Sequence, residues 1–187
     1  RVALALQQDG WYLRQDIIWH KPNPMPESVK DRCTKAHEYI FLLSKNVKYY
    51  FDNEAIKEDS KSAGKKSDGF KGRQGGAEYH ATGGGIGSDE KIYDKRNKRS
   101  VWTVTTKPFK GAHFATFPMD LIKPCVLAGC SEGGTVLDPF AGSGTTGIVA
   151  ANNDRNAVMC ELNEEYINLA KERINTQVGL WAEVVDD

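Results

Sequence analysis

Leu137-Asp-Pro-Phe-Ala-Gly-Ser-Gly-Thr-Thr-Gly147 carries the strongest signal for the fold of this chain. Its second half, Gly142-Ser-Gly-Thr-Thr-Gly147, matches the pattern GxGxxG between an expected strand and an expected helix. Glycines let a backbone approach a ligand closely at a helix N-terminus, and an acid ending the next strand can accept hydrogen bonds from ribose hydroxyls. Glu161 is the acid at the end of the next expected strand, 19 residues after Gly142. The pattern therefore predicts a loop that binds an adenosine-containing cofactor.

The residues around this loop predict a β-loop-α-β-α unit. Strands are expected at 135–137 and 157–160, with a loop at 139–144 and a helix at 145–151 between them. A second helix is expected after Asn163, whose side chain suits an N-cap. Its apolar residues recur at helical spacing: Tyr166, Ile167, Ala170 and Ile174. Such a unit predicts a parallel sheet and an α/β fold with helices on both faces.

The rest of the chain predicts further elements of the same domain. We expect a helix stopped at Gly10, a strand at 11–19, a strand at 38–44, a short strand at 101–104, and a helix between Pro118 and Gly129 that Pro124 kinks or restarts. The 38–44 run is almost continuously apolar, which predicts burial on both faces. It is expected to form a hairpin with 48–51.

Residues 57–100 interrupt this pattern as a basic, glycine-rich insertion. They carry many charges and few apolar residues, so they cannot bury enough surface to fold independently. Within 61–99 there are ten basic residues against five acidic ones, whereas the chain as a whole has no net charge. A local excess of this kind favours contact with phosphates, so we expect this insertion to bind nucleic acid.

Composition limits the class of protein. The 187 residues are 40% apolar and 27% charged, which is typical of one globular domain. No apolar run approaches the roughly 20 residues of a membrane helix and no signal peptide is apparent at the start, so a cytoplasmic protein without membrane contact is expected. The four cysteines form no CxxC pair, so neither a metal site nor a disulfide framework is expected. Cys125 is interpreted as a packed thiol rather than a nucleophile.

Alternative nucleotide sites fit the loop less well. A Walker loop needs Lys after its last glycine, where this chain has Ile148. A dinucleotide fold needs several strands after its glycines, whereas only 26 residues follow Glu161. The residues Asp138-Pro-Phe140 before the glycines are not typical of dehydrogenases.

Four blocks in one order resemble the amino-methylating DNA methyltransferases of the β arrangement, in which the catalytic motif precedes the cofactor motif. One is the glycine stretch itself, Leu137 to Gly147. Gly111 to Pro118 is similar to the segment that closes over the methionine part of the cofactor. Asp16 to Pro26 is similar to the strand and loop beside the target base, and Arg32 to Glu38 to the next block.

The resemblance implies a mainly parallel, Rossmann-like sheet, S-adenosylmethionine as cofactor, and double-stranded DNA as substrate, methylated on the exocyclic amino group of adenine or cytosine. Whether a restriction endonuclease accompanies it is left open. Cofactor contacts are expected from Phe114, Thr116, Phe117, Asp138, Phe140, Ala141, Gly142, Ser143, Gly144, Thr145 and Glu161. The basic insertion 57–100 is then expected to be the target-recognition region. DNA or target-base contacts are expected from Lys21, Asn23, Lys95, Arg96, Lys98 and Arg99. His20 and His37 fit structural and functional roles equally.

One family feature is missing from the sequence. The acidic, asparaginyl or seryl Pro-Pro-aromatic tetrapeptide, expected upstream of Trp19, does not occur, so the catalytic residue is unknown. We expect truncation rather than degeneration, and hence a sheet that is incomplete at the N-terminus. A nicotinamide-dependent oxidoreductase and a non-catalytic DNA-binding remnant stay open as alternatives.

Overall fold

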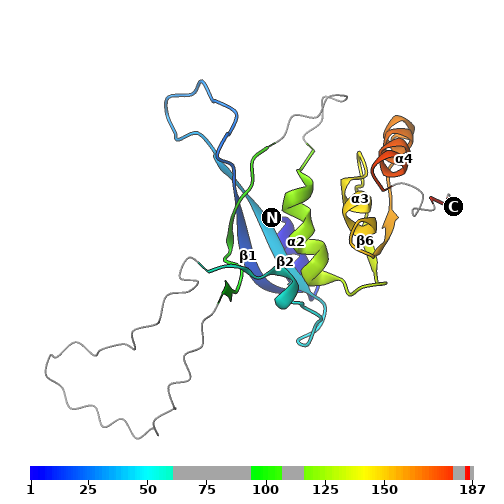
Figure 1. The fold of residues 1–187 in the computed structure, drawn as a ribbon. Helices are drawn as coiled ribbons and strands as arrows, with labels where there is room; N and C mark the ends of the chain where they lie inside the picture. Colours follow the sequence, from blue (N-terminus) through cyan, green and yellow to red (C-terminus); the bar gives the residue numbers. More distant parts are fainter. Residues whose placement is uncertain (61–93, 107–115, 179–183, 186–187) are drawn as a thin grey trace, which may run out of the picture. The chain divides into compact units, whose positions relative to one another are not determined.

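The computed structural model describes residues 1–60, 94–106, 116–178 and 184–185. Phe114 and most of the expected insertion therefore lie outside the described residues. The chain divides into two compact units, one formed by Arg1–Ile56 with Arg99–Asp187 and the other by Lys57–Lys98. The first unit contains the helices and the two sheets described next (Figure 1).

A three-stranded sheet forms the first half of this unit. Its order is β2 (His37–Ser44), β1 (Tyr12–His20) and β5 (Val101–Thr103), with β2 antiparallel and β5 parallel to β1. Helix α1 (Val2–Gln8) precedes β1 and ends before Gly10, whose φ of 94° is the left-handed conformation that glycine adopts readily. The predicted helix stop and both predicted strands are thus confirmed, within a residue or two.

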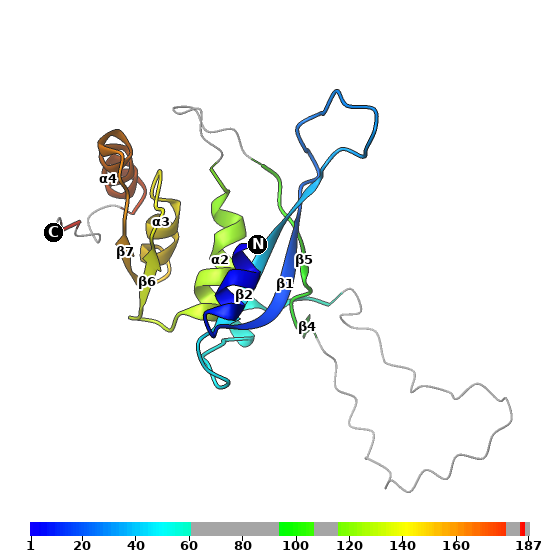
Figure 2. The ribbon, with the colours of Figure 1, turned by 180° about the vertical axis from the view of Figure 1, so that it is seen from behind.

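One face of this sheet forms a core with helix α2 (Met119–Gly129). Ile17, Trp19, Trp102 and Leu121 are buried together, and the Trp19 indole donates a hydrogen bond to the Val104 carbonyl at 2.8 Å. Figure 2 shows α1 and α2 on the same side of the three strands. The aromatic and β-branched residues of β1 therefore alternate inward, as the pleat requires.

Two predictions for this region are wrong. β2 is not buried on both faces, because α2 covers only one and leaves Tyr39 and Phe41 52% and 42% exposed. The expected hairpin with 48–51 does not form: 48–51 is not a strand, and the partner of the edge strand β2 is β1. Arg14, at the register shift in β1, donates to the carbonyls of Asn46 and Val47 at 2.9 and 2.8 Å and so satisfies acceptors in the bend after β2.

The second half of the unit is the predicted β-loop-α-β-α segment. β6 (Thr135–Asp138) pairs in parallel with β7 (Asn156–Met159), and α3 (Thr145–Ala151) connects them. Helix α4 (Glu164–Val178) follows, with Asn163 accepting a hydrogen bond from the Glu165 N–H as the predicted N-cap. α3 packs against α2, α4 and β7, and Ile148 and Ala150 are fully buried. Figure 1 shows α3 between α2 and α4.

Helix α2 continues through Pro124 instead of restarting there. Pro118 is its N-cap rather than its first helical residue, one position from the expectation. The Cys125 thiol lies 3.8 Å from the Leu121 carbonyl and packs against the core of the three-stranded sheet. None of the described helices is long and apolar enough to span a membrane.

The second unit is described only near its ends. β3 (Glu58–Asp59) pairs antiparallel with β4 (Lys95–Arg96) in a two-stranded sheet. The Arg96 guanidinium forms an ion pair with the Glu58 carboxylate at 3.0 Å. The proposed recognition role of this region stays a prediction.

Candidate functional site

The glycine loop lies at the carboxyl ends of the parallel strands β6 and β7. Gly142 and Gly144 have φ angles of 52° and 77°, which other residues adopt only with strain. The Ala141 N–H donates to the Cys160 carbonyl at 3.0 Å, and the Gly144 N–H donates to the Ala141 carbonyl at 2.9 Å. These bonds bend the chain sharply into α3. In open α/β sheets this edge is where ligands bind.

Asp138 braces the loop from the end of β6. One carboxylate oxygen accepts the Phe140 N–H at 3.0 Å, and the other accepts the hydroxyl of the buried Thr146 at 2.6 Å. Both oxygens are thus engaged within the loop and the first turn of α3. In this structure Asp138 holds the loop in shape, and its predicted contact with a cofactor stays a prediction.

Glu161 lies opposite the loop, just after β7. One of its oxygens accepts the Gly142 N–H at 2.8 Å, and the other accepts the N–H groups of Leu162 and Asn163 at 2.9 and 3.0 Å. Hydrogen bonds from Asn163, Gly142 and Leu162 lower the pKa of Glu161, although partial burial opposes them. A carboxylate offers about four acceptor positions. Glu161 is therefore held ionised and oriented with acceptor capacity to spare.

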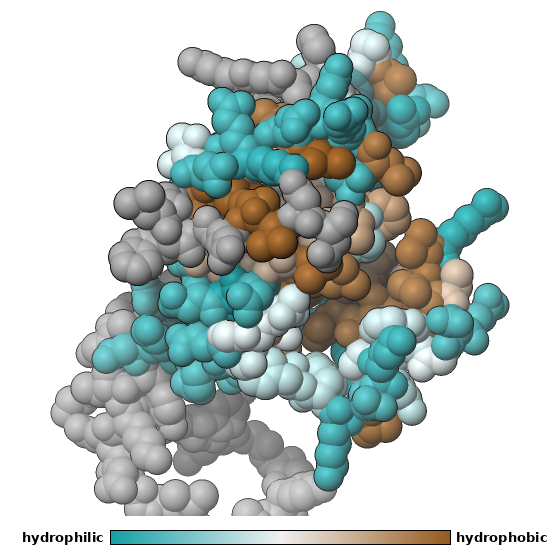
Figure 3. Space-filling model, turned by 90° about the vertical axis from the view of Figure 1, so that its right-hand side faces the viewer, coloured by the Kyte–Doolittle hydropathy of each residue, from teal (hydrophilic) through white to brown (hydrophobic). Residues whose placement is uncertain are grey.

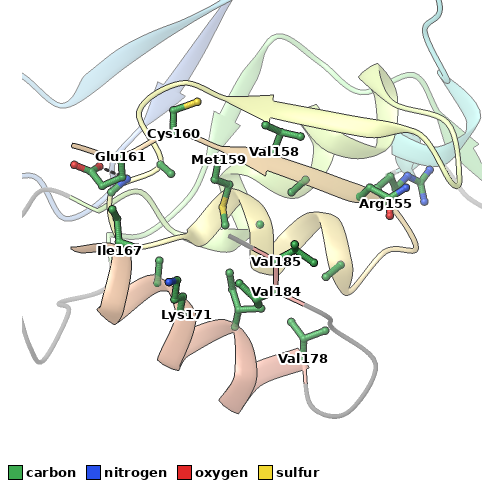
Figure 4. Close-up of a pocket in the computed structure, with 18 of the residues that line it drawn as sticks. Arg155, Val158, Met159, Cys160, Glu161, Ile167, Lys171, Val178, Val184 and Val185 are labelled. Atoms are coloured by element: carbon green, nitrogen blue, oxygen red, sulfur yellow. Dashed lines mark hydrogen bonds between the residues drawn. The ribbon is translucent and has the colours of Figure 1, made fainter. Parts of the chain in front are cut away.

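A cavity of about 1160 Å³ runs along β7 and reaches this site. Figure 4 shows Glu161 and Ile167 at one end, Arg155 at the other, and Val184 and Val185 between them. Near Glu161 the lining includes Gly142 and the exposed side chains of Phe140 and Leu162. Figure 3 views the side on which Figure 1 shows α4, and apolar side chains gather in the middle of that face. The Glu161 end combines apolar surface with fixed polar groups, as binding sites do, and it adjoins the glycine loop.

Helix α4 supports the loop from behind. A side chain at Gly144 would place its Cβ 2.8 Å from the Ala170 Cβ, which is closer than atoms approach without a shift. Gly144, Thr145 and Ala170 are all buried. Glycine is therefore required at 144 both by its φ angle and by the approach of α4.

The other expected cofactor residues lie on a different segment. Phe114 is outside the described residues, whereas Thr116 and Phe117 immediately precede α2 and its N-cap. Phe117 is partly buried and packs against the core formed by Ile17, Trp19, Trp102 and Leu121. The structure gives Phe117 a packing role, and its contact with a cofactor stays a prediction.

Lys21 and Asn23 follow β1 and make contacts within the protein. The Lys21 ammonium lies over the Trp19 ring, 4.3 Å from its centroid, and forms an ion pair with Glu38. The Asn23 amide exchanges two hydrogen bonds with the backbone of Thr106, at 3.1 and 3.2 Å. Asn23 thereby ties the loop after β1 to the segment after β5. Contacts of either residue with DNA remain predictions.

The expected phosphate contacts are divided between the two units. Lys95, Arg96 and Lys98 belong to the second unit, and Arg99 begins the return to the first. Lys95 and Arg99 are exposed, whereas Arg96 is paired with Glu58. Among the described residues, no group of three or more His, Cys, Asp or Glu side chains could hold a metal ion. The His20 ring contacts the Thr103 hydroxyl at 3.1 Å.

Comparison with protein families and sequences gives a consistent result. A family model described as DNA methylase matches residues 1–172. Type II methyltransferase M.SmaI of Serratia marcescens is 53% identical over 174 residues, which are 93% of this chain and 50% of that protein. Type II methyltransferase M.Cfr9I of Citrobacter freundii is 51% identical, over 93% of this chain and 48% of that protein. The chain thus spans about half the length of these curated relatives.

Solved structures share the fold. M1.HpyAVI in its SAM complex superposes with a TM-score of 0.60 at 23% identity, over 92% of this chain and 67% of that one. A putative DNA modification methylase from Thermus thermophilus, complexed with S-adenosyl-L-methionine, gives a TM-score of 0.56 at 25% identity, over 99% of this chain and 62% of that one. The predicted α/β fold is confirmed by this likeness.

Proposed function

We propose, since this chain belongs to the DNA methylase family, that it is the cofactor-binding part of a type II DNA methyltransferase. The enzyme would transfer a methyl group from S-adenosylmethionine to the exocyclic amino group of adenine or cytosine in double-stranded DNA. We also propose a cytoplasmic location, because the proposed substrate is DNA.

The observation that carries this proposal is the contact between Glu161 and the glycine loop. The carboxylate of Glu161 and the N–H of Gly142 meet at 2.8 Å where β6 and β7 end. The ionised oxygens suit the two hydroxyls of a ribose, and the positive φ angles bring the loop backbone within reach of a ligand. A carboxylate acceptor next to a loop of glycine backbone is the arrangement that suits the ribose of an adenosine group.

The residues present fit S-adenosylmethionine. Glu161 would hold the ribose, the loop around Gly142 would lie against the middle of the cofactor, and Phe140 and Leu162 offer apolar surface beside it for a flat ring. A ribose diol needs two acceptor positions, and three backbone donors already use part of the capacity of Glu161. Binding should therefore compete with or share the Gly142 bond.

When bound, S-adenosylmethionine supplies an electrophilic methyl group on a sulfonium centre. The role of the described residues is to bind and orient: Glu161 and the loop fix the cofactor, and Asp138 with Thr146 fixes the loop. The target base has to be flipped out of the duplex before its amino group can reach such a site. The sequence contains no Pro-Pro-aromatic tetrapeptide to accept the amino hydrogens, so the catalytic acceptor is not assigned.

DNA contact is proposed for Lys95, Arg96 and Lys98 of the second unit and for Arg99 of the first. Lys95 and Arg99 are exposed, as phosphate contacts must be. Each phosphate contact changes the slope of log affinity against log salt by about 0.9. Replacing Lys95 and Arg99 by glutamine in the full-length enzyme should flatten that slope. An unchanged slope would place DNA elsewhere.

Calorimetry with the 187-residue chain tests the cofactor assignment. We expect S-adenosylmethionine to bind and NADH not to bind, since the same loop pattern occurs in both classes of protein. Binding of NADH alone would favour an oxidoreductase. A second assay measures transfer of labelled methyl to DNA, which we expect from the full-length enzyme and not from residues 1–187. Transfer by residues 1–187 would mean that the acceptor lies within them.

A further inference from the structure

Ser143 lies in a part of the glycine loop whose conformation is not fixed by helix or strand geometry. It lies between Gly142 and Gly144, both with positive φ, so the loop here follows neither helix nor strand geometry. Loops of this kind keep one conformation only when surrounding groups hold them. The two flanking residues have contacts that are already described: Gly142 donates to Glu161, and Gly144 is packed against Ala170.

Arg173 supplies the contacts to Ser143 itself. It extends from α4, one turn after Ala170, and its Nη1 atom donates to the Ser143 carbonyl oxygen and, at 2.7 Å, to the Ser143 hydroxyl. The same atom lies 3.4 Å from the Thr145 hydroxyl. One guanidinium nitrogen therefore contacts three oxygens around the middle of the loop. Hydrogen bonds from a charged donor are stronger than those between neutral groups.

The environment of Arg173 differs from that of an ordinary helix-surface arginine. It is partly buried on a helix that otherwise packs through Ala170 and Ile174, and burial lowers the pKa of Arg173. Moving a guanidinium out of water is costly unless fixed acceptors replace the water. The neighbouring Lys171 lines the cavity along β7, whereas Arg173 does not. Its contacts are with the loop rather than with the space that a ligand would fill.

We propose that Arg173 is a positioning residue that locks Ser143, and through it holds the Gly142 N–H and Glu161 in the arrangement that receives the cofactor. This inference rests on the proposed function, because it concerns the same loop. Helix α4 then holds the loop in two ways, by the polar contact of Arg173 with Ser143 and by the close packing of Ala170 on Gly144. Sequence reasoning placed only apolar residues of this helix against the domain and did not single out Arg173.

Substitutions of Arg173 in the 187-residue chain test the lock. Arg173→Met keeps the aliphatic stem and removes every donor, so S-adenosylmethionine should bind about tenfold more weakly by calorimetry. Arg173→Lys keeps the charge but not the planar fork and should fall between Met and wild type. Adding Ser143→Ala to Arg173→Met should cost little more than Arg173→Met alone, because the two groups act as one pair.

Arg155→Met is the matched control. Arg155 is also a partly buried arginine that donates to backbone carbonyls, those of Cys130 and Asn153, but at the other end of β7. Its loss should lower the free energy of unfolding and leave cofactor affinity unchanged. Hydrogen exchange at the Gly142 amide gives a readout without ligand: exchange should speed up in Arg173→Met beyond any change in Arg155→Met.

The outcomes separate this inference from the function on which it rests. Weaker binding together with faster Gly142 exchange in Arg173→Met, against unchanged values in Arg155→Met, supports the lock. Wild-type affinity and wild-type exchange in a folded Arg173→Met chain would overturn the lock alone. A wild-type chain that binds no S-adenosylmethionine would overturn the proposed function and, with it, the role given to Arg173.

Discussion

The two ends of strand β7 use charge in opposite ways. At the carboxyl end, the Glu161 carboxylate collects N–H donors from Gly142, Leu162 and Asn163. At the amino end, the Arg155 guanidinium donates to carbonyl oxygens, with 3.1 Å to that of Cys130. Both side chains pair with backbone, but Glu161 bonds to the glycine loop at the mouth of α3, whereas Arg155 bonds to the turn around Asp154, whose φ is 58°, and to the end of α2.

This contrast indicates which charged groups are available to a ligand. Arg155 joins two turns through its hydrogen bonds to the Cys130 and Asn153 carbonyls, and it lies at the end of the cavity away from Glu161 and the glycine loop. A carboxylate beside backbone of positive φ can exchange one donor for another, since a ligand hydroxyl can replace an N–H. Changes at the carboxyl end of β7 should therefore alter cofactor binding, whereas changes at its amino end should alter only the stability of the fold.

The largest effect is expected from Gly144→Ala. The left-handed φ of 77° costs about 1 to 2 kcal/mol for a residue with a side chain. The contact of the new Cβ with Ala170 adds about 1 to 3 kcal/mol of overpacking. Urea unfolding should show the combined loss, and calorimetry should show no cofactor binding.

Gly133→Ala is the counterpart at the amino end of β6. Its φ of 71° gives similar backbone strain, but no atom lies within 4 Å of the added Cβ. Stability should therefore fall by only about 1 to 2 kcal/mol, and S-adenosylmethionine should bind as in wild type. Equal damage in both variants would remove the distinction between the ends.

Glu161→Gln should come next. The amide has one oxygen and one NH₂ group where the carboxylate accepts three N–H donors, so the loop contact is disturbed and the acceptor for the ribose is weakened. We expect about tenfold weaker S-adenosylmethionine binding. Calorimetry on the folded variant measures this, and wild-type affinity would exclude Glu161 as the ribose acceptor.

The pH dependence of binding tests the same carboxylate. Backbone donors lower the pKa of Glu161 below its ordinary value of 4.5. Because the folded state favours the ionised form, Glu161 stabilises the fold above that value, and this contribution is lost as the pH falls through the lowered pKa. Affinity for S-adenosylmethionine should stay constant from neutral pH to about 5 and fall only below 4.5. A fall centred at about pH 6.5 would indicate a histidine instead.

The smallest effect is expected from Thr146→Val. This change removes the hydroxyl that donates to Asp138 at 2.6 Å while keeping the side-chain shape. The free energy of unfolding should drop by about 1 kcal/mol, with slightly weaker binding because Asp138 braces the loop. Thr176→Val, which removes an exposed bond to the Glu172 carbonyl, is the control and should change neither quantity. Equal losses in the two variants would show that the bond from Thr146 to Asp138 contributes no more to stability than an exposed bond does.

Local sequence signals were sufficient to predict the β6-to-α4 segment and the position of its loop. The glycines at 142 and 144, the helical spacing from Tyr166 to Ile174, and the N-cap at Asn163 each depend on a few consecutive residues. The α3 bounds were predicted to the residue for this reason. The partnership of Glu161 with the loop was also readable, because the carboxyl ends of adjacent parallel strands meet at one edge.

Tertiary contacts settled what these local signals could not specify. Whether Tyr39 and Phe41 are buried depends on which faces of β2 are covered, and the bend before 48–51 is held by Arg14, which is 32 and 33 residues from the carbonyls it contacts. The roles of Asp138, Asn23 and Arg173 within the protein likewise depend on partners 8, 83 and 30 residues away. Periodicity records which residues prefer burial or a helix, but a polar side chain selects its partner only once the chain has brought distant acceptors and donors together.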